Sequence, residues 1–81
     1  MATYEETLEA TVLLLRRHVP ASRNVLAKHS IQGDLGLDSL AVMELVADAE
    51  DRFRVTIPNE ILTELVTVDD VARAIHRLQG A

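Results

Sequence analysis

Asp34-Leu35-Gly36-Leu37-Asp38-Ser39-Leu40 runs directly into Ala41-Val42-Met43-Glu44-Leu45-Val46 near the middle of the chain. This pattern is typical of a loop that ends in an amphipathic helix. We expect Asp38 to cap the helix, because its carboxylate can accept hydrogen bonds from the free N–H groups of the first turn. Ser39 then occupies the first helical position, where the helix dipole and those N–H groups favour a phosphate ester. The same three residues, 38–40, also fit an ordinary capped helix.

The composition predicts one small helical domain that spans residues 1–81. Apolar residues make up 48% of the 81 residues, yet the only aromatic ones are Tyr4 and Phe53. The core must therefore consist of aliphatic side chains, which suits small packed helices. The chain has no cysteine, so disulfides, thiolate metal sites and a protein thiol nucleophile are excluded.

The charge distribution argues against nucleic acid and anionic membranes as partners. The formal net charge is −5, and residues 34–51 contain six acidic residues and no Lys or Arg. Such a surface repels phosphates and attracts basic partners. No signal peptide and no apolar run of about 20 residues is present, so we expect a soluble, cytoplasmic protein. We also expect a monomer.

The periodicity of apolar residues predicts an all-α antiparallel bundle of three main helices and one short helix, with a long loop between the first two. We expect the first helix from Tyr4 to about Val19, capped by Thr3, and the second from Ser39 to about Arg54. Asn59 is expected to cap the short helix from Glu60 to about Val66, and Thr67, with Asp70, to cap the last helix. The first helix should bury Tyr4, Leu8, Val12, Leu15 and Val19, and the last Val68, Val71, Ala72, Ile75 and Leu78.

The loop from Pro20 to Asp38 is long for a compact domain, and such loops usually carry function. Leu35 and Leu37 are expected to point into the core, with Gly36 supplying a tight turn between them. A short helical turn is expected within residues 23–28.

The second helix has two faces when its residues are placed at steps of 100°. The inner face carries Val42, Leu45, Val46, Ala49 and Phe53, with Met43 at its edge. The outer face combines an exposed leucine directly after Ser39 with an acidic stripe. A solvated helix face is one interpretation; a docking surface is the other, since apolar contact gives orientation and charge speeds encounter. We favour docking, by Leu40, Glu44, Ala47, Asp48 and Asp51.

The stretch resembles the phosphopantetheine attachment site of acyl carrier proteins: Asp-Ser-Leu at residues 38–40, preceded by Leu-Gly and followed by Glu-Leu-Val. The resemblance extends through Phe53, Val55, Ile57-Pro58 and Glu60 to the Thr67-Val68-x-Asp70-Val71 motif. It implies that a phosphopantetheinyl transferase, with magnesium, moves 4′-phosphopantetheine from coenzyme A onto Ser39, flanked by Asp38 and Leu40. It also implies a carrier that catalyses nothing itself. Its partners would be an acyltransferase or ligase, a ketosynthase and modifying enzymes with basic docking surfaces.

Four positions depart from the fatty-acid members of that family. Ala41 stands where those carriers usually have an acid, Arg52 and Arg54 put positive charge at the end of the helix, and Ile31 stands where Phe is common. These departures favour a discrete carrier for a polyketide or mixed polyketide–peptide pathway. A fatty-acid carrier and an aminoacyl or peptidyl carrier are the alternatives, and an unmodified helical interaction module is the alternative from another class.

An acyl chain would need a gap in which to lie, and plain core packing competes with that interpretation. The residues that could line such a gap are Met43, Val46, Ile57, Leu62 and Ile75. Enzyme chemistry is not indicated. His18, His29 and His76 lack metal-ligand spacing, and neither a Gly-x-Ser-x-Gly turn nor a Gly-rich phosphate loop is present.

Overall fold

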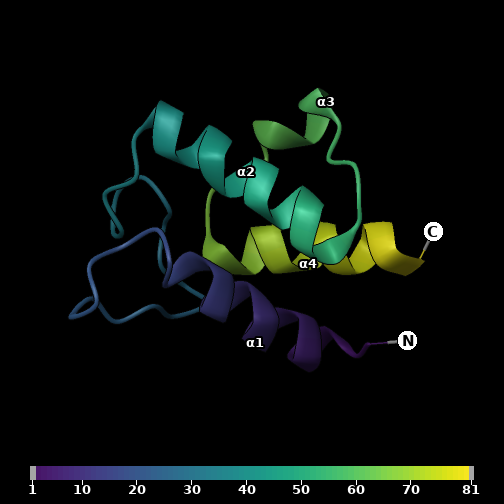
Figure 1. The fold of residues 1–81 in the computed structure, drawn as a ribbon, viewed down its shortest axis with the longest axis horizontal. Coiled ribbons are helices and arrows are strands. Elements are labelled where there is room, and N and C mark those ends of the chain that lie inside the picture. The colour runs from purple at the N-terminus through teal and green to yellow at the C-terminus, as the bar shows by residue number, and fades with distance from the viewer. Residues whose placement is uncertain (1, 81) are drawn as a thin grey trace.

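The computed structural model describes residues 2–80, which form four helices and no strand. They are α1 (Tyr4–Leu15), α2 (Ser39–Phe53), α3 (Asn59–Leu62) and α4 (Val68–Gly80). Figure 1 shows that α1 runs opposite to α2 and α4, with the long loop at the far end of the bundle and α3 beside α2. The predicted all-α bundle is therefore confirmed.

Helix α1 begins as predicted but ends earlier. The Thr3 hydroxyl accepts from the Glu6 N–H at 3.1 Å and the Glu6 carboxylate accepts from the Thr3 N–H at 2.8 Å, a complete capping box. The predicted end near Val19 is wrong, because the helix stops at Leu15. Beyond it, the N–H groups of residues 17 and 18 donate to carbonyls three residues back, at 3.1 and 2.9 Å. This tight turn leads the chain to Pro20.

The buried face of α1 differs from the predicted stripe. Leu14, which falls off that stripe, is 2% exposed, while Leu8 and Val12 are only half-buried. Two threonines, Thr7 and Thr11, are also buried. The Thr11 hydroxyl donates to the Thr7 carbonyl at 2.7 Å, so its burial leaves no unpaired polar group. The buried face of α1 is thus rotated from the predicted one.

Helix α4 forms the centre of the core. Its capping box is complete, since the Thr67 hydroxyl accepts from the Asp70 N–H at 3.1 Å and the Asp70 carboxylate accepts from the Thr67 N–H at 2.9 Å. Its inner face follows the predicted stripe, apart from Leu78, which is half-buried, and an unpredicted contribution from Ala74. The buried residues are Val68, Val71, Ala72, Ala74 and Ile75.

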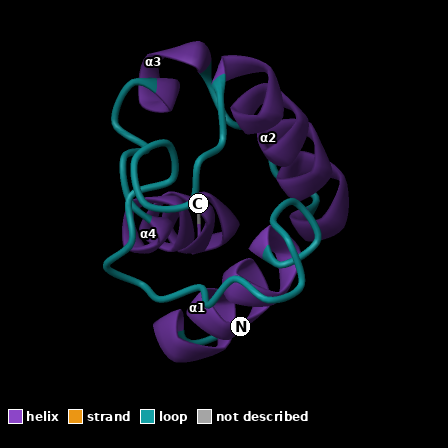
Figure 2. Cartoon of the chain, turned by 90° about the vertical axis from the view of Figure 1, so that its left-hand side faces the viewer, coloured by secondary structure: helices purple, strands orange, loops and turns teal. Residues whose placement is uncertain are grey.

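The long loop is held by the chain segment that precedes α4. Ser30 and Thr67 form an isolated antiparallel bridge, the Ile31 N–H donates to the Val66 carbonyl at 2.8 Å, and the Val68 N–H donates to the His29 carbonyl at 3.0 Å. Figure 2 shows this loop at the end of the bundle nearest the viewer. In place of the predicted helical turn over residues 23–28, only residues 27 and 28 form a turn, closed by the His29 N–H bond to the Leu26 carbonyl at 3.0 Å.

Helix α3 is shorter than predicted. It starts at Asn59, with Pro58 in the cap position and no side-chain cap, and ends at Leu62. The expected cap by Asn59 and end near Val66 are therefore wrong. Pro58 itself has a φ of −63° and a ψ of 150°, so its fixed φ starts the turn without a capping side chain.

Candidate functional site

The predicted cap fixes the start of α2. Asp38 has extended backbone angles, and its carboxylate accepts from the Ala41 N–H at 2.8 Å. The Ser39 and Leu40 N–H groups have no intrahelical acceptor, as at the start of any helix. The first turn of α2 contains no acidic side chain. The positive end of this 15-residue helix is therefore offset by Asp38 alone, beside the Ser39 hydroxyl.

Ser39 is exposed, and the loop residues just before it are anchored in the core. Directly before it, Leu35 and Leu37 are buried as predicted, and Gly36 between them has a φ of 74°. The Leu37 N–H donates to the carbonyl of Ile31, which is itself buried. Because apolar anchors hold the loop from below, the serine is presented to solvent above it.

Earlier in the loop, Asp34 and Ser30 form a reciprocal pair of hydrogen bonds. The Asp34 carboxylate accepts from the Ser30 N–H at 2.8 Å, and the Ser30 hydroxyl accepts from the Asp34 N–H at 2.8 Å. The Ser30 N–H holds the pKa of the Asp34 carboxyl below its usual value. The Asp34 carbonyl in turn accepts from the Arg23 guanidinium. These bonds favour an ionised, fixed Asp34 at the base of the loop.

A groove of about 350 Å³ opens next to Ser39, between α2 and the segment around α3. Four of the predicted lining residues take part, namely Met43, Val46, Ile57 and Leu62. The prediction for Ile75 is wrong, because this residue is completely buried in the core. Sequence reasoning missed six of the lining residues: Gln32, Ser39, Val42, Ala47, Glu50 and Asn59.

Helical spacing could have found part of this set. Ser39, Met43, Val46 and Glu50 are separated by four, three and four residues, which places them on one face of α2. The Glu50 carboxylate accepts from the Ile57 N–H at 2.8 Å and so fixes the far wall of the groove. Gln32 and Asn59 come from distant parts of the chain, and no local pattern points to them.

The outer face of α2 is largely open. Leu40 is 66% exposed, and Glu44, Ala47 and Asp51 are also exposed. Asp48, the fifth residue predicted for this surface, is half-buried. Its carboxylate lies 3.0 Å from the His18 Nε2 and 3.9 Å from the Arg52 Nε. Asp48 therefore joins α2 to the turn after α1 as well as facing outward.

The three histidines lie apart. His18 pairs with Asp48, the His29 ring accepts from the Leu26 N–H at 3.1 Å, and His76 packs edge-on against Tyr4. Within residues 2–80, no cluster of three or more potential metal ligands occurs. No helix in this part of the chain has the length and apolar character needed to cross a membrane.

A small bundle that presents an exposed serine at the start of its second long helix fits a carrier domain, and comparison with known proteins shows the family. A family described as "Phosphopantetheine attachment site" matches residues 18–75. An acyl carrier protein of Kineococcus radiotolerans is 36% identical over 99% of this chain and 100% of its own length. One of Campylobacter concisus is 37% identical over 96% and 97%. One of an Exiguobacterium species is 49% identical, but over 64% of this chain and 66% of its own.

The chain therefore belongs to the acyl carrier protein family. Members of this family are carriers rather than catalysts, and their attachment domain bears covalently bound 4′-phosphopantetheine. The resemblance noted in the sequence is confirmed at the level of the family and its cofactor.

Proposed function

We propose that Ser39 is the attachment residue, and that this single carrier domain, as a monomer, holds acyl intermediates for a polyketide or polyketide–peptide pathway. The observation that supports Ser39 is its exposure at the start of α2, above a loop held by Leu35 and Leu37. A transferase can approach such a hydroxyl from solvent without opening the core.

The residues around Ser39 fit a phosphopantetheine arm. The Ser39 and Leu40 N–H groups and the helix dipole favour the negative charge of a phosphodiester. Asp38 keeps the helix start in place through its bond to the Ala41 N–H, and the apolar wall of the groove starts next to Ser39. When bound, the group supplies a thiol that holds the acyl cargo as a thioester, which the chain itself cannot do because it has no cysteine.

Three features support the narrower assignment of pathway. Ala41 leaves the first turn of α2 without an acid, and Arg52 places a cation in its last turn. Ile31, at the loop position where fatty-acid carriers often have Phe, is fully buried. A fatty-acid carrier remains the alternative, favoured by the exposed acids Glu44 and Asp51 on the outer face. In either pathway, the partners of this chain would be a phosphopantetheinyl transferase, an acyltransferase or ligase, a ketosynthase and modifying enzymes with basic surfaces.

Intact mass measurement tests the attachment residue. We expect the chain to gain the mass of one phosphopantetheine group on incubation with coenzyme A, magnesium and a broad-specificity transferase. Ser39→Ala should gain nothing, while Ser22→Ala, which alters another exposed serine, should gain the same mass as the wild type. An unchanged wild-type mass would overturn the proposal and favour the unmodified helical interaction module.

The pathway is tested with the loaded chain. We expect a polyketide ketosynthase to elongate an acyl group on this carrier faster than a bacterial fatty-acid ketosynthase does, measured by mass spectrometry of the carrier over time. Faster elongation by the fatty-acid enzyme would assign the chain to the alternative pathway and leave the attachment residue unaffected.

A further inference from the structure

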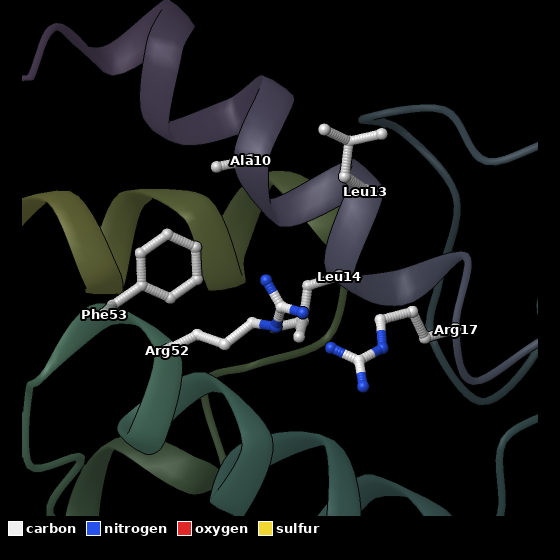
Figure 3. A pocket seen from close by; sticks show the side chains of 6 residues that line it. All are labelled: Ala10, Leu13, Leu14, Arg17, Arg52 and Phe53. Carbon is white, nitrogen blue, oxygen red and sulfur yellow. The ribbon is translucent and has the colours of Figure 1, made fainter.

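A second hollow lies at the other end of α2. It measures about 280 Å³ and separates α1 from the last turn of α2. We call it the α1–α2 hollow; its lining residues, drawn in Figure 3, are Ala10, Leu13, Leu14, Arg17, Arg52 and Phe53. Ser39 and Phe53 are the first and last residues of α2, so the hollow lies roughly 20 Å along the helix from the serine.

The floor and one wall of this hollow are apolar. Leu14 is 2% exposed and closes the hollow toward the core, and Phe53 is half-buried beside it. Leu13 stands at the edge with 58% of its surface exposed. Its exposed apolar surface would leave water on contact with an aliphatic side chain of a partner.

The rim of the hollow is cationic although the chain as a whole is acidic. Figure 3 shows the guanidinium groups of Arg17, from the turn after α1, and Arg52, from α2, turned toward each other. Within residues 2–80, Arg17 has no ion pair, and Arg52 reaches only Asp48, at 3.9 Å. That carboxylate is already held by His18 at 3.0 Å. Among the described residues, Arg17 therefore faces this hollow without an ion pair, while Arg52 shares Asp48 with His18.

We infer that the α1–α2 hollow is a second docking site, which binds an acidic amphipathic helix of a partner protein. Such a helix places a carboxylate between Arg17 and Arg52 and an aliphatic side chain on Leu13. Arginine favours this role because its planar group binds carboxylates in a defined geometry.

The site goes beyond the proposed carrier function because it leaves Ser39 free. A partner bound at the far end of α2 covers neither the serine nor Leu40. The carrier can then be held by one protein while enzymes exchange at the other end of the helix.

Amide chemical shifts of the pantetheinylated protein test this inference. The probe is a synthetic helical peptide with glutamate and leucine on one face; a second peptide replaces each glutamate by glutamine. We expect the acidic peptide to cause saturable shifts at Ala10, Leu13, Arg17 and Phe53, and the neutral peptide to bind at least about tenfold more weakly. The double variant Leu13→Ser/Arg17→Glu should weaken the acidic peptide about tenfold or more.

The matched control makes the same chemical changes elsewhere. Val66→Ser/Arg77→Glu also removes an exposed apolar side chain and reverses an exposed arginine, and it should bind the peptide like the wild type. Equal loss in both variants, equal binding of the two peptides, or shifts confined to other residues would overturn the inference. So would movement of the same amides on dilution of the protein alone, which would identify a second copy as the occupant. Loading of Ser39, followed by mass in each variant, reports separately on the proposed carrier function.

Discussion

At the scale of single residues, the position of Ser39 depends on one unusual backbone conformation. Gly36 has a φ of 74°, which L side chains rarely adopt, and a Cβ added there would meet no atom within 4 Å. The demand on this residue is thus conformational rather than steric. It allows Leu35 and Leu37, on either side, both to reach the core.

We therefore expect Gly36→Ala to lower the free energy of unfolding by about 1 kcal/mol, which lowers the melting temperature by about 4–8 °C in a domain of this size. Thermal unfolding followed by circular dichroism measures the change. Gly80→Ala serves as the control: this glycine also has open space around it, but it lies in α4 without a positive φ. Alanine should be neutral or slightly stabilising there. Similar losses in both variants would contradict the conformational explanation.

At the scale of elements, the start of α4 depends on one carboxylate. Asp70 accepts from the Thr67 N–H at 2.9 Å and from the Val66 N–H at 3.1 Å. These bonds, that from Thr67 first, hold the pKa of the Asp70 carboxyl below its usual value. A lowered pKa in the folded state means that the stabilisation is complete above the pKa of the unfolded chain and is lost as pH falls.

Asp70→Ala should accordingly destabilise the protein by about 1 kcal/mol at neutral pH, the usual cost of losing a cap. The difference from the wild type should narrow as pH falls below about 4, where the carboxyl of the unfolded chain begins to protonate. Urea unfolding at several pH values measures both effects. Asp69→Ala, which removes only an exposed pair with Arg73, should cost less at neutral pH. A difference that stays constant down to acid pH would show that the carboxylate charge is not what stabilises the helix start.

The caps of the helices and their ends differ in how well the sequence predicts them. The caps at Thr3, Asp38 and Thr67 were predictable because each involves residues three apart. The ends of the helices were less predictable. Helix α1 stops at Leu15, where a tight turn leads into the loop beyond it.

Two predictions about buried residues are wrong, each for its own physical reason. The buried face of α1 includes Thr11, whose hydroxyl donates a hydrogen bond within its own helix. The polarity of threonine therefore does not indicate which face of α1 is buried. Ile75 was assigned to the groove although it is fully buried, because periodicity identifies an inward face and not the layer that a residue occupies. For Ser39 the motif sufficed, since both the cap and the exposure arise within a few residues.

At the scale of the whole molecule, α2 carries charges of both signs. Its outer face carries Glu44 and Asp51, while Arg52 in its last turn and Arg17 nearby face the hollow at its end. The Asp48 carboxylate lies 3.0 Å from the His18 Nε2 and 3.9 Å from the Arg52 Nε. A partner with a basic surface should therefore approach the outer face of α2 first. Asp48 is a poor site for testing this, because its replacement also breaks a contact between α2 and the turn after α1.

Glu44→Lys tests the acidic face more cleanly. It should reduce the kcat/KM of transferase loading several-fold, up to about tenfold, at low salt, because rim charges chiefly set the rate of encounter. Glu9→Lys on α1 makes the identical change in net charge, from −5 to −3, away from Ser39, and should have little effect. The loss in Glu44→Lys should shrink at about 0.15 M salt, where the screening length falls to about 8 Å. If both variants slow loading equally, net charge rather than a docking face governs the encounter; if neither does, the acids only solvate the helix.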